Sequence, residues 1–117
     1  MKLQLTTREL DGIVIIEAIG RLTLTDSHTR LRDLIHVFAG GGRKLFLLNL
    51  AGVEFIDSDG MGELARCFST VRQNGGDLKL VQVNDKVRRL LEITRVITLF
   101  ELYSDEKEAL RAYNARA

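Results

Sequence analysis

One stretch of this sequence limits the possible folds more than any other: a continuous apolar run that ends abruptly in small polar residues. Residues 45–50 are almost wholly apolar, which is typical of a strand covered on both faces. After Ile56 comes the polar segment 57–60, and apolar residues then recur at the spacing of one helical face, at Met61, Leu64, Ala65, Phe68 and Val71. This predicts a buried strand, a short turn and a helix. We expect function at the free N–H groups that begin the helix.

The residues before this unit predict a hairpin and a first helix. Alternating residues favour an edge strand at about 3–8, and an Asp-Gly turn at 11–12 leads to a second strand at about 13–19. The helix that follows has its cap candidates at Thr25, Asp26 and Ser27 and its apolar stripe at Leu31, Leu34, Ile35 and Phe38. Three glycines at 40–42 end it, because glycine adopts the left-handed conformation without penalty.

The residues after the central unit continue the alternation. Strands are predicted at 78–83 and 97–102, and Asn84 and Ser104 can each cap the helix that follows a strand. The expected order is β-β-α-β-α-β-α-β-α, which implies a mixed, mostly parallel sheet of about five strands with four helices and right-handed crossovers. We therefore expect a single α/β domain over residues 1–117.

Bulk properties argue against several classes of function. The 17 basic and 16 acidic side chains leave a formal charge of +1, so no global field indicates nucleic acid or an anionic membrane as a partner. No run approaches the roughly 20 apolar residues of a membrane span, and the N-terminus has no signal-peptide apolar region. We expect a cytoplasmic protein without direct membrane insertion.

Residues that could bind a metal or act in catalysis are few. His28 and His36 lie on one predicted helix, and their separation corresponds to a rise of about 12 Å, too far to share a metal ion. Cys67 is the single cysteine, and beside Phe68 in the helical pattern it is expected to be a small, half-buried packing residue. We expect no metal, no other cofactor and no enzymatic activity.

The segment from Asp57 to Gly62 permits two interpretations. In the first it is a plain helix cap, in which Asp57 or Ser58 accepts hydrogen bonds from the first turn. That leaves Gly60 and Gly62 unexplained, since each costs about 1 kcal/mol relative to alanine within a helix. In the second, the glycines leave the backbone bare for another molecule, and a kinase adds about −1.5 to −2 charges at Ser58. These residues alone leave both interpretations open.

The sequence resembles the STAS domain, specifically the stand-alone bacterial anti-sigma factor antagonists. The resemblance covers essentially the whole chain, and it includes Phe-Ile-Asp-Ser-Asp-Gly-Met-Gly at 55–62, Leu-Asn-Leu at 48–50, Val-Arg-Arg-Leu-Leu at 87–91 and Leu-Phe at 99–100. It implies a non-enzymatic module that binds an anti-sigma factor with serine kinase activity, while a serine phosphatase resets the cycle. By this match Ser58 is the phosphate acceptor, and phosphorylation there prevents binding.

The resemblance also implies a partner-binding surface, and the chain departs from the family pattern at two positions of it. The surface comprises Asp57, Ser58, Asp59, Gly60, Met61, Gly62 and Thr23. The family usually has a second Ser or Thr where this chain has Asp59, which places a fixed negative charge beside the acceptor. It often has Gly-Glu-Leu-Asp at the end of the second strand, where this chain reads Gly-Arg-Leu-Thr and ends in Thr23.

Three other functions fit parts of the sequence. Asp59 and Thr23 favour a STAS subunit of a transporter-associated or signalling-scaffold complex without sigma-factor control. An aspartyl-phosphate receiver would use Asp57, but no acidic pair follows the first strands, and Lys79 lies within a strand. An enzyme or nucleotide-binding protein of similar shape would need a base–nucleophile pair or a phosphate cradle, and the motifs for these are missing from the sequence.

Overall fold

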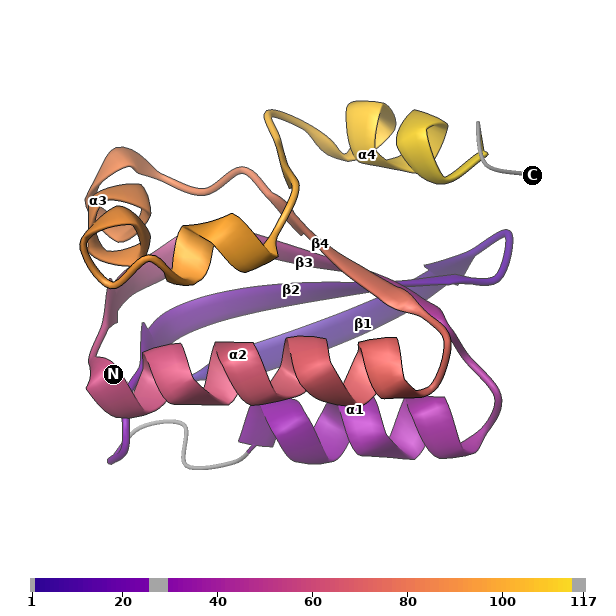
Figure 1. Ribbon diagram of the computed structural model, residues 1–117, viewed down its shortest axis with the longest axis horizontal. Coiled ribbons are helices and arrows are strands. Elements are labelled where there is room, and N and C mark those ends of the chain that lie inside the picture. The colour runs from indigo at the N-terminus through magenta and orange to yellow at the C-terminus, as the bar shows by residue number, and fades with distance from the viewer. Residues whose placement is uncertain (1, 26–29, 115–117) are drawn as a thin grey trace.

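The fold is built on one five-stranded sheet whose strands lie side by side in chain order (Figure 1). The computed structural model describes residues 2–25 and 30–114. β1 (Gln4–Leu10) is antiparallel to β2 (Ile13–Leu22), and the parallel strands that follow are β3 (Leu45–Ile56), β4 (Asp77–Val81) and β5 (Leu102–Tyr103). The helices are α1 (Arg30–Gly40), α2 (Ser58–Gln73), α3 (Asp85–Ile93) and α4 (Glu106–Asn114).

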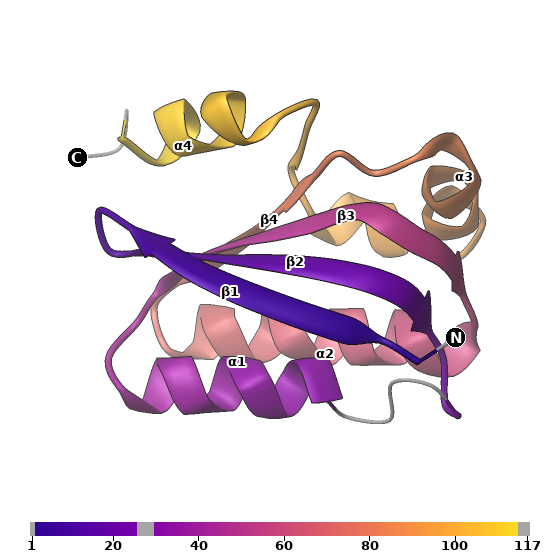
Figure 2. The same ribbon diagram turned by 180° about the vertical axis from the view of Figure 1, so that it is seen from behind.

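Helices cover both faces of the sheet. α1 and α2 lie side by side against one face and α4 lies against the other, as two opposite views show (Figure 1, Figure 2). The larger apolar core lies between the sheet and α1, α2 and α3, and it includes Phe46 and Leu64. A smaller core lies under α4 and includes Ile15, Leu47 and Tyr113. β3 is therefore covered on both faces, as its apolar sequence predicts.

Within the described residues, the order of elements confirms the predicted α/β fold of five strands and four helices. The mixed, mostly parallel sheet is also confirmed. The predicted strand at 97–102 is wrong, because a 3₁₀ helix, η1 (Val96–Leu99), occupies most of it and β5 is short. Ile97 packs against the core and Phe100 is buried, and their spacing of three residues suits a 3₁₀ turn.

The register between β2 and β3 places the start of α2 beside the end of β2. β2 extends beyond its predicted end, and its register with β3 shifts twice within residues 17–21. Past the second shift, Arg21 pairs with Phe55 and Leu22 with Ile56. The turn that follows Ile56 therefore lies beside the residues that follow Leu22.

Some predictions concern residues outside the described ranges: the cap candidates Asp26 and Ser27, and one histidine, His28. The other histidine, His36, is exposed on α1. Among the described residues, none of the helices combines the length and the apolar character that crossing a membrane requires.

Candidate functional site

One side chain, Asp57, holds the turn between β3 and α2. Its backbone is extended, and its Oδ1 accepts a hydrogen bond of 2.8 Å from the Gly60 N–H in the first turn of α2. Its Oδ2 accepts a second hydrogen bond, of 3.2 Å, from the Leu24 N–H, and its own N–H donates to the Leu22 carbonyl at 3.3 Å. Asp57 is thus the helix cap of the first interpretation, and it also joins α2 to the end of β2.

Ser58 and Asp59 are exposed in the first turn of α2. Ser58 is the first helical residue, so its hydroxyl lies at the positive end of the helix dipole. The carboxylates of Asp57 and Asp59 precede and follow it in the chain. The site therefore presents a hydroxyl near fixed negative charges and near the N–H groups that begin a helix, where a phosphate would change the local charge strongly.

Gly62 lies one helical turn after Ser58 and is half-buried. A β-carbon built on it would lie 3.2 Å from Nη1 of Arg66, the far end of a flexible side chain. Residues four apart are neighbours on a helix, so this face carries Ser58, then bare backbone, then a guanidinium. The arrangement leaves room for a partner at Gly62, where contact remains a prediction.

Gly60, in contrast, is required by the fold. It is buried, and a β-carbon built on it would lie 1.9 Å from the Leu22 carbonyl oxygen and 3.0 Å from Cγ2 of Ile56. The close approach that this glycine permits is therefore between α2 and the end of β2, within the chain. The prediction that the backbone at Gly60 is bare is therefore wrong, and contact of a partner with Gly60 stays a prediction.

Met61 and Thr23 are also buried. Met61 is 5% exposed, and its Sδ accepts a hydrogen bond of 3.7 Å from the Thr94 hydroxyl just after α3. Thr23, which follows β2, is 8% exposed. The side chains of these two residues are covered in the free protein, and their contact with a partner stays a prediction. The accessible part of the predicted site consists of the exposed Ser58 and Asp59 and the half-buried Asp57 and Gly62.

Sequence reasoning missed Glu63, which connects the site to α1. Its side chain is almost fully buried, and Oε2 accepts hydrogen bonds from the N–H groups of Leu31 and Arg32 at 3.0 and 3.1 Å. These donors belong to the first turn of α1, so the carboxylate holds the start of α1 against α2. The signal in the sequence is an acid that lies between Met61 and Leu64 on the apolar side of the predicted helix.

Cys67 of α2 packs in the core, and it is fully buried where the sequence predicts half burial. Burial, and after it the negative charge of Glu63, raise the pKa of the Cys67 thiol to about 12. Since the thiolate is the reactive form, this thiol is inert in the folded protein.

This raised pKa predicts slow alkylation of native Cys67. At about pH 8 the folded thiol carries roughly a thousandfold less thiolate than an unfolded cysteine, so iodoacetamide should label it more slowly by at least that factor. The free energy of unfolding should also fall as the pH rises from about 9 toward 12, because the unfolded thiol ionises first. Mass spectrometry measures the labelling, urea unfolding measures the stability, and Cys67→Ala should remove this part of the pH dependence. Rapid labelling of the native protein would contradict the burial.

Residues 4–109 match the family model of the STAS domain. The chain belongs to the STAS domain family. The resemblance drawn from the sequence is therefore confirmed. The match runs from the first residue of β1 into α4, so the STAS fold includes the turn that carries Ser58.

Other proteins with the STAS fold are similar over nearly the whole chain. An anti-sigma F factor antagonist of Paenibacillus polymyxa is 27% identical over 113 residues, which are 94% of this chain and 94% of the relative. The crystal structure of a Thermotoga maritima protein has a TM-score of 0.85 at 26% identity, covering 92% of each chain. SpoIIAA of Bacillus in its phosphorylated form has a TM-score of 0.69 at 19% identity, covering 95% of this chain and 98% of its own, and this likeness shows the fold alone.

Proposed function

We propose that this STAS protein is an anti-sigma factor antagonist that binds an anti-sigma factor with serine kinase activity and is switched off by phosphorylation of Ser58. The observation that carries the proposal is the exposed Ser58 at the start of α2. It is supported by the similarity of the chain to an anti-sigma F factor antagonist. The protein then acts as a regulatory binding module without catalysis of its own, and a serine phosphatase restores the binding form.

Local charge explains how a phosphate would act as the switch. Asp57 and Asp59 already place negative charge beside Ser58, and a phosphate adds about −1.5 to −2 charges. The helix N-terminus favours a nearby anion by about 0.3–1 kcal/mol, so the modified turn can stay folded. The larger effect falls on the partner, whose surface would have to cover the added charge on binding.

The hydrogen bonds of the turn support Ser58 rather than Asp57 as the acceptor. Both carboxylate oxygens of Asp57 accept hydrogen bonds from backbone N–H groups, those of Gly60 and Leu24. A phosphate on Asp57 would disrupt this cap, at a cost of about 1 kcal/mol or more. A phosphate on the Ser58 hydroxyl leaves these hydrogen bonds in place.

Phosphorylation by a purified anti-sigma factor kinase from the same genome tests the proposal. With ATP, wild-type protein should gain a phosphate at Ser58, located by tandem mass spectrometry, and Ser58→Ala should gain none. Ser69→Ala is the matched control, because Ser69 is another exposed serine of α2, and it should be phosphorylated normally. The phosphate should resist hydroxylamine, whereas a hydroxylamine-labile phosphate would indicate Asp57.

Binding to the same kinase provides the second measurement. Ser58→Asp should weaken binding at least about tenfold, or about 1.4 kcal/mol, whereas Ser69→Asp should leave it unchanged. Phosphate found on other residues alone, or binding that is indifferent to Ser58→Asp, would contradict the proposal. Stable co-purification with membrane ATPase components in place of a soluble kinase would favour the transporter-associated alternative.

A further inference from the structure

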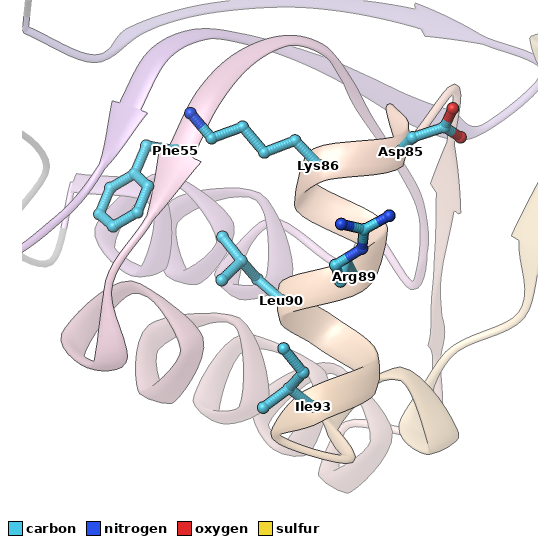
Figure 3. A pocket seen from close by; sticks show the side chains of 6 residues that line it. All are labelled: Phe55, Asp85, Lys86, Arg89, Leu90 and Ile93. Atoms are coloured by element: carbon cyan, nitrogen blue, oxygen red, sulfur yellow. The ribbon is translucent and has the colours of Figure 1, made fainter.

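A groove between β3 and α3 combines exposed apolar side chains with cations (Figure 3). It has a volume of about 330 Å³, and its lining residues are Phe55, Asp85, Lys86, Arg89, Leu90 and Ile93. Phe55 belongs to the last residues of β3, and the others share one side of α3. The two most accessible apolar side chains are Ile93, 72% exposed, and Phe55, 38% exposed.

α3 carries an apolar surface toward the groove in addition to its core-facing surface. Val87 and Leu91 are fully buried in the core. Leu90 and Ile93, three residues apart, share the face of the helix that lines the groove. Removing apolar surface from water is worth about 25 cal/mol per Å². A partner that covers this second apolar surface, which stays exposed after folding, therefore gains binding free energy.

Hydrogen bonds at the two ends of α3 connect this helix to β3 and to the first turn of α2. At the first end, the Asn84 side chain donates a hydrogen bond of 2.8 Å to the Val53 carbonyl and caps α3 by accepting one of 2.9 Å from the Val87 N–H. At the second end, the Thr94 hydroxyl donates to Met61 in the first turn of α2. α3 is therefore held in place against β3 and α2, so a partner meets a preformed groove, which lowers the entropic cost of binding.

Cations border the apolar floor of the groove. Nζ of Lys86 lies 5.8 Å from the centroid of the Phe55 ring, and Arg89 follows Lys86 along the same side of α3. Asp85 is the one acid among the lining residues, so positive charge is in excess at the groove and complements an acidic ligand.

We propose that this groove binds an acidic amphipathic helix of the partner that contacts Ser58, an inference that rests on the proposed function. Apolar side chains one turn apart on that helix pack against Phe55, Leu90 and Ile93. Carboxylates beside them pair with Lys86 and Arg89. The groove then supplies affinity, and Ser58 supplies the switch.

The chemistry of the groove favours a protein helix over a lipid surface. Peripheral membrane helices present an apolar face with many Lys and Arg residues on the polar face. Here the apolar side chains line a hollow, and the cations at its border include only Lys86 and Arg89 among the lining residues. The formal charge of +1 for the whole chain provides no general attraction to an anionic membrane.

A designed peptide tests the groove without the natural partner. The probe is a fluorescein-labelled amphipathic helix of about four turns with leucines at i and i+4 flanked by glutamates, and its control peptide has lysine in place of each glutamate. Fluorescence anisotropy should show saturable binding of the acidic peptide, at least about tenfold tighter than that of the basic peptide. Amide NMR shifts on binding should concentrate at Phe55 and along α3.

Variants with matched controls locate the binding site. Ile93→Ser and Arg89→Glu should each weaken binding of the acidic peptide about tenfold. Val37→Ser is the control for the first, because Val37 on α1 is also 72% exposed, and Lys107→Glu on α4 is the control for the second. Both controls should bind the peptide as wild type does. Ser58→Asp should bind it within about twofold of wild type, so failure of the groove and failure of the switch are separate results.

Equal binding of the acidic and basic peptides, or binding that Ile93→Ser leaves unchanged, would overturn the proposal. Binding to phosphatidylserine vesicles that Arg89→Glu abolishes would also overturn it and assign the groove to a membrane surface. A dimer in sedimentation that Ile93→Ser dissociates would overturn it in favour of a second copy of this chain.

Discussion

Gly60→Ala should lower the free energy of unfolding by about 3 kcal/mol, although alanine is the better helix former. The added β-carbon would lie 1.9 Å from the carbonyl oxygen of Leu22 and 2.8 Å from its carbon, well inside van der Waals contact. Because the obstructing atoms are backbone, α2 has to move away from β2. That movement also strains the hydrogen bonds by which Asp57 joins the two elements.

Gly62→Ala is the matched control, since it makes the same chemical change in the same helix. Its β-carbon would meet the flexible end of Arg66 at 3.2 Å, so the helix propensity of alanine should dominate and stabilise the protein by up to about 1 kcal/mol. Urea unfolding followed by circular dichroism measures both variants, and an equal loss in the two would contradict the packing explanation for Gly60. Any loss of partner binding by the stable Gly62→Ala protein would report on the surface itself.

The different roles of these two glycines show what local sequence can and cannot predict. The apolar run of β3 and the helical period after it predict the strand, the turn and α2, because few other structures bury such a pattern. The neighbour that excludes a side chain at Gly60 is Leu22, which lies far earlier in the chain. Leu22 reaches that place through register shifts between β2 and β3, which tertiary pairing decides and no local pattern encodes.

The incorrect strand at 97–102 has a related cause. β-propensity depends strongly on the pairing and packing around a residue, so an apolar segment can serve equally as a short strand or as a turn that covers the core. Here the segment covers the end of the core: Val96 and Ile97 pack against it from η1, and Phe100 follows η1. The strand β5 begins only at Leu102.

The division of the site into support and surface follows from helix geometry. Asp57, Gly60 and Met61 lie three and four residues apart, and all three face the rest of the protein. Ser58 and Gly62 are also four apart, on a neighbouring face that is more open. The segment 57–62, which the sequence suggests is one contact surface, therefore divides into two faces of a helical turn, and the covered face fixes the position of Ser58.

Lys79→Met should destabilise the protein by about 3 kcal/mol, because it removes a buried cation that neutralises the nearly buried Asp77 on the α4 face of the sheet. Lys79 is 1% exposed, and its ammonium pairs with Glu101 and lies 3.5 Å from Oδ2 of the nearly buried Asp77. It also lies 5.2 Å from the ring centroid of Tyr103 in β5 and 4.8 Å from that of Tyr113 in α4. Methionine fills much of the same space but leaves the Asp77 carboxylate without its close ammonium, at a site shielded from water.

A double-mutant cycle with Asp77→Asn separates the charge effect from packing. The double variant should be at least about 1 kcal/mol more stable than the sum of the two single losses predicts. The reason is that Asp77→Asn removes the carboxylate whose close ammonium Lys79→Met takes away. Arg72→Met is the control, because Arg72 approaches Asp77 at 3.9 Å with a largely exposed side chain and should cost at most about 0.5 kcal/mol. If Lys79→Met costs no more than Arg72→Met in urea unfolding, the pair of Lys79 and Asp77 does not stabilise the α4 face. If Ser58 is phosphorylated as proposed, its phosphorylation should remain normal in folded Lys79→Met protein, because Lys79 lies on the α4 face of the sheet and α2, which begins at Ser58, covers the other face (Figure 1).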